Sequence, residues 1–362
     1  MVNWRLLGAF AVLLPQLAGQ SISGQPQANP FDVLRSCMAI EARDIARLEA
    51  GGTLARVLSE DDGNVAVFGA RRVAVDGDRL VAWMQQVEQL RQGKYVESMA
   101  RFSDPPALED LARLSLDAYD LQILRECTST KCRAKLTGRE IEILRQEMDP
   151  AGRNGDARLD AAFRRLILDR MRGYMEGGHP ALGRWVDGRS PEPLDAVFAS
   201  LLKRTPCVTE QFADLADYLE RFPDPVDRRF DTFFYWSKER LGGKPIVSAT
   251  QVVIARGRGD RARDALVVGR QLFATHYMNG SLNVTAVVGS GPGSAQYLVI
   301  LNRTNVDFLR GFFGTFARKA VERRIKSELP AILAQLARKL ETGPPGIGAT
   351  GIEPPAETRA IR

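Results

Sequence analysis

The chain has 362 residues, of which 44% are hydrophobic and 26% charged, a balance typical of globular proteins that excludes a mostly disordered chain. At about 100–200 residues per domain, this length predicts two domains, or one large domain with an insertion. The net charge of +6 is mild and does not indicate a nucleic-acid partner, and two histidines exclude a metal site built on several of them; we expect no metal and no cofactor.

Residues 1–23 are predicted to be a secretory signal peptide. Arg5 supplies positive charge, residues 6–14 form an apolar core of nine residues, and small or polar residues follow. Cleavage after Gly19 and cleavage after Ser23 both fit the pattern, and the alternative is a buried amino-terminal helix. Only nine of the 50 basic residues are lysine, a bias common in GC-rich bacterial genomes. We therefore expect an exported bacterial protein, periplasmic or secreted.

The next two regions are predicted to lead into an α+β domain. Residues 24–63 are interpreted as a linker followed by a helix over 31–50, which ends at Gly51-Gly52. Residues 64–137 form the first part of the domain itself. Alternating apolar side chains predict strands, and apolar side chains three or four positions apart predict helices. The strands are expected at Asn64–Val75 and Val96–Phe102, and the helices from Asp76 or Asp78 to about Gln92 and over Ala107–Leu114.

Four cysteines in an exported chain predict disulfides. Cys127 and Cys132 are separated by a polar four-residue spacer, and we interpret the flanking runs Tyr119–Glu126 and Lys131–Leu136 as a hairpin. Paired strands bring facing side chains within about 4.5–5.5 Å, which suits a disulfide. Cys37 and Cys207 then pair by elimination, and buried free thiols are the alternative for this second pair.

Residues 138–225 are predicted to form an all-helical insertion. Thr137 is placed to cap its first helix, and Arg158–Glu176 carries apolar side chains at helical spacing. Glycine and proline residues punctuate the rest of the segment, as they do between short helices.

Residues 226–341 are predicted to form an antiparallel sheet followed by a long helix. Because the connections between its β-branched runs are short, these runs should form a meander, and Asn279-Gly280 is a strong hairpin signal. The runs are Ile246–Ala255, Ala265–Tyr277, Ser281–Val288 and Gln296–Arg303. Phe308–Leu340 is expected to be an amphipathic helix that Pro330 kinks or splits, and residues 342–362 a disordered tail.

This order of elements, over Asn64–Leu136 and Phe230–Leu340, resembles the helix-grip architecture of START-type lipid-binding domains. The resemblance implies an α+β fold in which a curved antiparallel sheet packs on a long carboxyl-terminal helix and encloses an apolar cavity; the helical insertion is larger than usual for that architecture. Three stretches, Phe233–Glu239, Ala274–Tyr277 and Tyr297–Arg303, are also similar to those of an uncharacterised group of exported bacterial proteins. That second resemblance implies no activity.

The last helix links this fold to a function. Its apolar stripe is too long to leave in water, and its phenylalanines exceed what a tight helix-to-sheet contact needs, so we expect them to face a cavity. The protein is therefore predicted to bind a lipid or another apolar small molecule without catalysis. The candidate ligand-binding residues are Phe233, Tyr235, Trp236, His276, Phe312, Phe313 and Phe316. The basic face, with Arg318, Arg323, Arg324 and Lys326, is expected to stay in solvent, available to an anionic membrane surface.

Two other functions remain open at this point. A cell-envelope hydrolase centred on His276 would need a nucleophile or a carboxylate within about 3.2 Å of the imidazole. A structural or interaction protein would dock through the helical insertion. Ser237 beside Lys238 offers a serine with a lysine base, but no G-x-S-x-G motif surrounds it. With no catalytic motif in the chain, the binding function is favoured.

Overall fold

The computed structural model describes residues 29–60, 63–148, 155–187, 193–223, 229–240, 244–289, 294–310 and 314–344. The predicted signal peptide lies outside the described residues, as does the predicted tail from residue 345 onward. In the described part of the chain, no helix is both long enough and apolar enough to cross a membrane.

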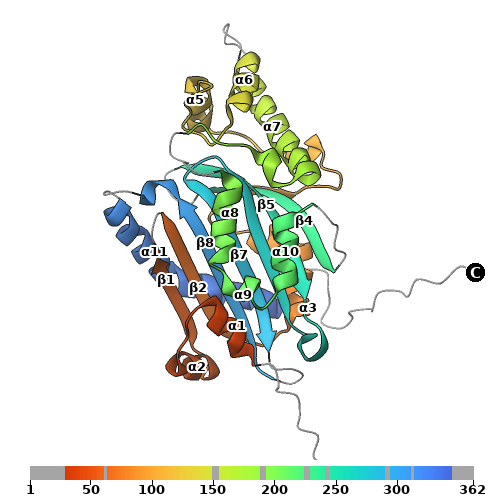
Figure 1. The fold of residues 1–362 in the computed structure, drawn as a ribbon, viewed down its shortest axis with the longest axis vertical. Coiled ribbons are helices and arrows are strands. Elements are labelled where there is room, and N and C mark those ends of the chain that lie inside the picture. The colour runs from red at the N-terminus through yellow and green to blue at the C-terminus, as the bar shows by residue number, and fades with distance from the viewer. Residues whose placement is uncertain are drawn as a thin grey trace, which may run out of the picture.

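An eight-stranded antiparallel sheet forms the centre of the molecule (Figure 1), with the strands in the order β1-β2-β8-β7-β6-β5-β4-β3. Strands β5 to β8 follow one another as the predicted meander, β4 and β3 continue the sheet on one side, and β2 and β1 continue it on the other. The strands are β1 (Thr53–Ser59), β2 (Asn64–Val73), β3 (Val96–Arg101), β4 (Phe230–Arg240), β5 (Pro245–Arg256), β6 (Ala265–Ala274), β7 (Met278–Gly289) and β8 (Gln296–Val306).

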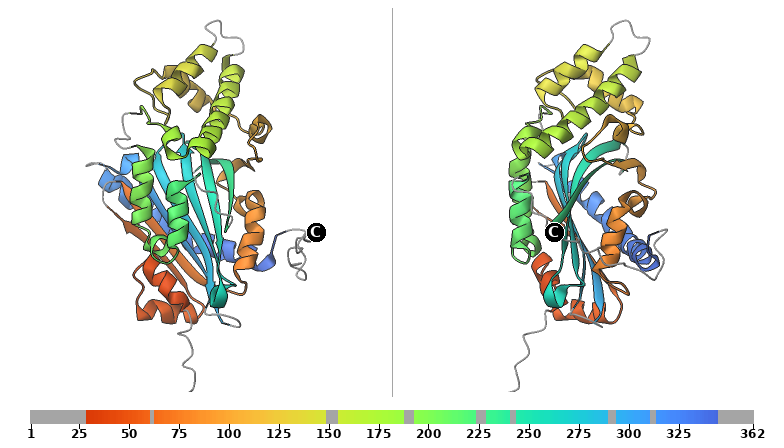
Figure 2. Two further views of the ribbon diagram at one scale, coloured as in Figure 1. Left: turned by 45° about the vertical axis from the view of Figure 1, so that its right-hand side comes forward. Right: turned by 90° about the vertical axis from the view of Figure 1, so that its right-hand side faces the viewer.

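Helices cover both faces of this sheet, which Figure 2 shows nearly edge-on in its right-hand view. Side chains along a strand alternate between the two faces, so both helical layers find apolar partners on the sheet. One face carries α3 (Gly77–Gln85), α4 (Val87–Arg91) and the long α11 (Gly314–Thr342). The other carries α1 (Pro30–Cys37), α8 (Leu194–Lys203), α9 (Pro206–Thr209) and α10 (Ala213–Arg221), and α2 (Ala42–Glu49) packs beside β1 and β2.

A third group of helices lies at one end of the sheet (Figure 1). It consists of α5 (Ala118–Glu126), α6 (Gly138–Glu147) and α7 (Gly155–Gly177), and its apolar cluster includes Trp236 and Phe273 from the sheet. Thr137 caps α6 as predicted, because its hydroxyl accepts a hydrogen bond from the Glu140 backbone N–H. The helices that follow residue 137 therefore pack in two places: α6 and α7 at the end of the sheet, and α8 to α10 on one of its faces.

The α+β class, the antiparallel sheet and the packing of the last helix on that sheet are confirmed. Both predicted disulfides are present: Cys37–Cys207 joins α1 to α9, and Cys127–Cys132 closes a small loop, with Cα atoms 4.5 Å and 4.4 Å apart. Two disulfides are compatible with an exported protein. Pro330 does not split α11, which continues through it.

The predicted hairpin around Cys127 and Cys132 is wrong. Residues 118–126 form helix α5, because Leu121 and Leu124 are three positions apart and both are buried against the neighbouring helices. Only an isolated bridge between Thr128 and Lys131 remains of the expected pairing. The short loop alone is enough to bring the two cysteines together.

The predicted turn at Asn279-Gly280 is also wrong, because both residues lie inside β7. The chain turns at residues 275–277, where Tyr277 has a φ of 66°. Asn279 is buried and its side-chain amide donates to Asn305 Oδ1 at 2.7 Å, which is a tertiary role. Gly280 lets α8 approach closely, since a Cβ there would lie 3.0 Å from Val197 Cγ1.

Other boundaries differ from the expectation. The helix predicted over 31–50 is two helices, and the one expected to reach Gln92 is interrupted at Gln86. Strands β1 and β4 were not predicted as strands. Arg318, expected in solvent, is half-buried and donates to the Leu309 carbonyl oxygen at 3.3 Å.

Candidate functional site

A cavity of about 570 Å³ lies between the sheet, the α3–α4 pair and α11. Ligand pockets in proteins span roughly 300–1,000 Å³ and have mostly apolar walls. Here the apolar wall comes from three separate parts of the chain: Leu80, Met84 and Val87 on α3 and α4, Val252 and Val267 on the sheet, and Leu336 on α11. We call this space the apolar cavity.

The local sequence explains why the space stays open. Leu80, Met84 and Val87 follow one another at helical spacing, so α3 and α4 present one apolar face to the sheet. Opposite them β6 has Gly269, which has no side chain to fill the gap. A Cβ at Gly269 would meet Asn283 Cβ at 3.5 Å and Thr250 Cγ2 at 3.6 Å, which are ordinary contacts. A larger residue would therefore fit at position 269 without a clash, and glycine leaves this part of the space unfilled.

Polar groups also line the apolar cavity. Asn283 and Thr285 of β7 contribute from the sheet, and Arg91, Lys94 and Lys339 contribute basic groups from the segments around it. The Lys339 ammonium donates to the carbonyl oxygens of Gln89, Leu90 and Gln92 at 3.1, 2.7 and 3.0 Å, so it caps the end of α4. Burial lowers the pKa of Lys339. The cavity therefore has a mostly apolar wall together with hydrogen-bonding and basic groups.

The structure places the predicted ligand-binding residues in different parts of the molecule. Tyr235 lines the apolar cavity, and Phe233 lies on the same face of β4, with the Arg101 guanidinium 4.2 Å from its ring centre. Trp236 faces the opposite side because neighbouring strand residues alternate, and its indole N–H donates to the Asp110 carbonyl oxygen at 2.8 Å. Phe312 and Phe313 lie outside the described residues, as does the side chain of Phe316.

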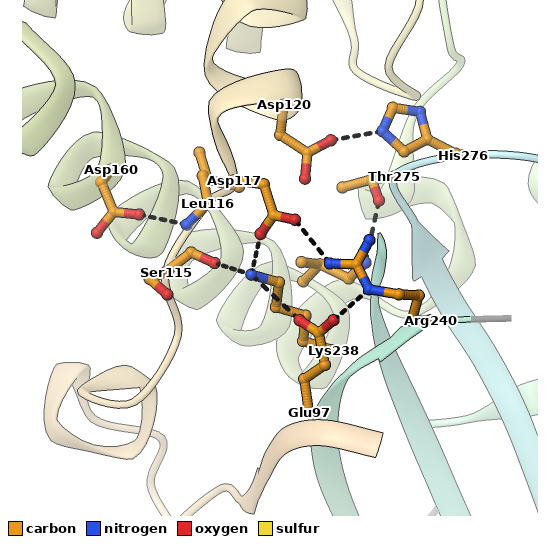
Figure 3. A network of polar contacts seen from close by, with 11 residues as sticks. Glu97, Ser115, Leu116, Asp117, Asp120, Asp160, Lys238, Arg240, Thr275 and His276 are labelled. Carbon is orange, nitrogen blue, oxygen red and sulfur yellow. Dashed lines mark hydrogen bonds and ion pairs between the residues drawn. The ribbon is translucent and has the colours of Figure 1, made fainter. Parts of the chain in front are cut away.

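His276 belongs to a second pocket, of about 350 Å³, at the end of the sheet below α5. Its Nε2 lies 2.6 Å from Asp120 Oδ1, and the two side chains are only 5% and 4% exposed (Figure 3). This meets the carboxylate condition for a histidine base. Among the described residues that line this pocket there is no serine or threonine, and Cys132 is held in its disulfide. The described lining of this pocket therefore offers no serine, threonine or free cysteine as a nucleophile beside His276.

The wall of this second pocket, which we call the polar pocket, is built around Lys135. The Lys135 ammonium is buried and lies 2.5 Å from Asp187 Oδ2, 2.8 Å from Asn279 Oδ1 and 3.4 Å from Asp307 Oδ2. Tyr277 stands beside this group. Burial, and after it the nearby Tyr119 and Asp307, raises the pKa of Tyr277, so its hydroxyl keeps its proton at neutral pH.

Ser237 and Lys238 do not form a catalytic pair, because they point to opposite faces of β4. The Ser237 hydroxyl is buried and donates to Glu239 Oε1 at 2.8 Å. Lys238 instead contacts Asp117 and donates to the Ser115 carbonyl oxygen at 2.9 Å (Figure 3). Burial disfavours the charge on Asp117, but hydrogen bonds from Lys238 and Arg240 hold its pKa below its usual range. This cluster ties β4 to the start of α5.

A further buried polar group lies on the α8–α10 side of the sheet. The Arg270 guanidinium is buried, donates to Tyr174 Oη at 3.0 Å and lies 2.5 Å from His179 Nδ1. Burial lowers the pKa of Arg270 to about 10. Burial and the Arg270 charge together lower the pKa of His179 to about 4, so this imidazole is neutral at pH 7.

Tyr235 and His276, which were predicted from the sequence as ligand-binding residues, each line a pocket, but most of the residues around them were not predicted. The helical face at Leu80, Met84 and Val87 was recognised, yet nothing in its spacing says that it covers a hollow. Asp120, Lys135 and Asp307 come from separate parts of the chain, so no motif joins them. Within the described ranges, no group of three or more histidine, cysteine, aspartate or glutamate residues is arranged to hold a metal ion.

Comparisons with models of protein families, with curated proteins and with solved structures found no match to this chain. A function for this chain is therefore inferred from the arrangement of its own residues.

Proposed function

We propose that this protein binds a lipid or another apolar small molecule in the apolar cavity, without acting on it catalytically. The observation that carries the proposal is the space of about 570 Å³ beneath the last helix, walled largely by apolar side chains. The space is partly open to solvent, so much of this apolar wall faces water. An apolar ligand would remove that surface from water, which contributes roughly 25 cal/mol per Å² of apolar area.

The lining of the apolar cavity supports an amphiphile with an acidic head group. Ile332 of α11 lines the cavity and is 44% exposed, so apolar surface continues from the inside of the protein to the outside. Lys94 is exposed and Arg91 is held by Glu239 at 2.6 Å, and both line the same space. An apolar chain would occupy the interior, and a carboxylate or phosphate would remain near these basic groups.

The outer face of α11 supports delivery to or from an anionic membrane surface. Lys319, Arg323, Arg324 and Lys326 are exposed on this helix. Each basic residue near an anionic bilayer contributes about 1 kcal/mol of attraction. These residues lie on the same helix that supplies Ile332, so a membrane-bound orientation would bring the opening of the cavity near the lipid.

The proposal is tested by ligand retention and by a matched pair of variants. Native mass spectrometry of protein purified from its own envelope should show a co-purifying lipid mass, and the delipidated protein should bind a dansyl-labelled fatty acid. Ile332→Glu puts a charge where the chain enters and should weaken probe binding at least tenfold. Because Ile332 is exposed, the free energy of unfolding should change by less than about 0.5 kcal/mol.

The control is Ala331→Glu, which adds the same charge one position along α11, at an exposed residue that does not line the cavity. It should leave both probe binding and stability unchanged. Absence of any bound lipid and of any probe uptake by the wild-type protein rejects the proposal. Equal weakening by both variants would show that the probe senses only the surface charge.

A further inference from the structure

The polar pocket has the features of a second binding site, separate from the apolar cavity. The two spaces have no lining residue in common. The polar pocket lies where β6 turns into β7, between this turn and the segment that holds Cys132. Its volume of about 350 Å³ is at the lower end of the range for small-molecule sites, so it suits a compact ligand.

One wall of the polar pocket carries a buried acceptor that the protein leaves unused. The Asp307 side chain is 5% exposed; its Oδ2 faces the Lys135 ammonium, while its Oδ1 has no hydrogen-bond partner among the described residues. A buried carboxylate oxygen without a donor destabilises the folded protein, because it has lost its hydrogen bonds to water and gained none in exchange. A ligand that donates a hydrogen bond at this point would remove that cost.

Another wall carries a cation that no carboxylate neutralises. The Lys244 ammonium contacts the Tyr119 hydroxyl and lies 4.3 Å from the centre of the Tyr119 ring and 6.0 Å from that of Tyr277. Within the described ranges it has no acidic group within 4 Å, unlike Lys135, which has two. Lys244 is half-buried, so its charge is less screened than one in open solvent.

The backbone between these two walls is strained. Tyr277 has a φ of 66°, a region that side chains other than glycine, asparagine and aspartate rarely occupy. The turn is held there because the Asp307 backbone N–H donates to the Tyr277 carbonyl oxygen at 2.9 Å. Backbone strain of this kind destabilises the folded protein and is concentrated at ligand sites. It brings Tyr277 and Asp307 together in one wall.

We propose that the polar pocket binds a small hydroxylated carboxylate, with its carboxylate on Lys244 and a hydroxyl donating to Asp307 Oδ1. The charge balance favours a neutral donor over an ammonium group. Of the basic residues that line the pocket, Lys135 is paired with Asp187 and Asp307, and Arg133 with Glu126, whereas Lys131 and Lys244 have no acidic group within 4 Å among the described residues. A ligand with net negative charge would reduce this excess of positive charge, and an added ammonium group would increase it.

Three ring-shaped probes of similar size separate the contributions of the two groups. D-Glucuronate carries a carboxylate and hydroxyls, D-glucose only hydroxyls, and cyclohexanecarboxylate only the carboxylate. Isothermal titration of the full chain should show saturable binding of D-glucuronate and at least tenfold weaker binding of the other two probes. Equal, non-saturating binding of all three, or no binding of D-glucuronate, would overturn the proposal.

Variants locate the binding. Lys244→Met should weaken D-glucuronate binding at least tenfold and leave the fold intact. Asp307→Asn should do the same, because Lys135 attracts the amide oxygen and turns Nδ2 toward the place of the unused acceptor. Unchanged D-glucuronate binding by Lys244→Met would refute the assignment, even if Asp307→Asn fails to fold.

Lys94→Met, at the apolar cavity, is the matched control and should bind D-glucuronate as the wild type does. Binding of the dansyl-labelled fatty acid should be unaffected in Lys244→Met. The two proposals can therefore fail independently of each other.

Discussion

Filling the apolar cavity from the sheet should make the protein more stable and less able to bind its ligand. Gly269 is the position to use, because a Cβ there makes only ordinary contacts, the nearest at 3.5 Å from Asn283 Cβ. Gly269→Leu would extend a side chain into the space between β6 and the α3–α4 pair. Most core substitutions from small to large overpack and destabilise by about 1–3 kcal/mol. The opposite sign is expected here because the added side chain would enter the apolar cavity and not a packed core.

The expected gain combines three effects. Burying a leucine side chain contributes roughly 1.5–3 kcal/mol, and replacing glycine within a strand adds about 0.5–1 kcal/mol through backbone entropy. Ordering the leucine side chain costs about 0.5–1 kcal/mol. The free energy of unfolding should therefore rise by roughly 2 kcal/mol if no neighbour has to move.

The assay pairs urea unfolding with titration of a dansyl-labelled fatty acid. Gly269→Leu should raise the urea midpoint and weaken probe binding at least tenfold. Gly269→Ala is the control: it should gain about 0.5–1 kcal/mol from backbone entropy alone and bind nearly as well as the wild type. Destabilisation by Gly269→Leu would show that the space is already packed. Undiminished probe binding in a stabilised Gly269→Leu protein would place the ligand elsewhere.

Three further predictions concern the disulfide that joins α1 to α9, a buried histidine and the outer face of α11. Replacing both Cys37 and Cys207 by serine should lower the free energy of unfolding by up to about 5 kcal/mol in the chain-entropy model, since 170 positions separate them; a loss below 1 kcal/mol by urea unfolding would contradict it. The pKa of His179 is about 4 in the folded protein, below its ordinary 6.5. Between these two pH values the unfolded protein binds a proton at His179 and the folded protein does not, so the contribution of His179 to the free energy of unfolding is complete above pH 6.5 and is lost as the pH falls toward 4. Urea unfolding at several pH values should show this loss in the wild type relative to His179→Gln, and parallel curves would exclude it. Reversing the charges of Arg323 and Arg324 to glutamate should leave the circular dichroism spectrum intact and weaken sedimentation with anionic liposomes at low salt; unchanged sedimentation would remove the proposed membrane contact.

Local periodicity was sufficient to predict much of the framework. Strands with alternating side chains, such as β2, β5 and β8, were identified because a period of two is a property of neighbouring residues alone. Helix α11 was identified for a similar reason, because helical spacing is also a property of neighbouring residues, and its Leu329, Leu333 and Leu340 are buried at that spacing. The capping of α6 by Thr137 was predicted because a capping box spans only four residues.

The errors occurred where local and tertiary effects compete. Short apolar runs such as residues 119–126 satisfy both helix and strand patterns, and packing against α6 and α7 decides for the helix. Asn279-Gly280 has the composition of a turn, but the contacts of Asn279 with Lys135 and Asn305 place it inside a strand. A residue's intrinsic preference is worth about 1 kcal/mol or less, and such buried contacts outweigh it.

The sequence by itself determined the class of the fold, the helix that closes one face and the cysteines that pair. Only the tertiary structure decided where a ligand could be held. His276 meets Asp120 from 156 positions away, and Asp307 reaches Lys135 across an even longer stretch of chain. The apolar cavity has no residue signature at all, because it is the volume that α3–α4, α11 and Gly269 together leave unfilled. A void is a property of how distant elements pack, so no local pattern of side chains can encode it.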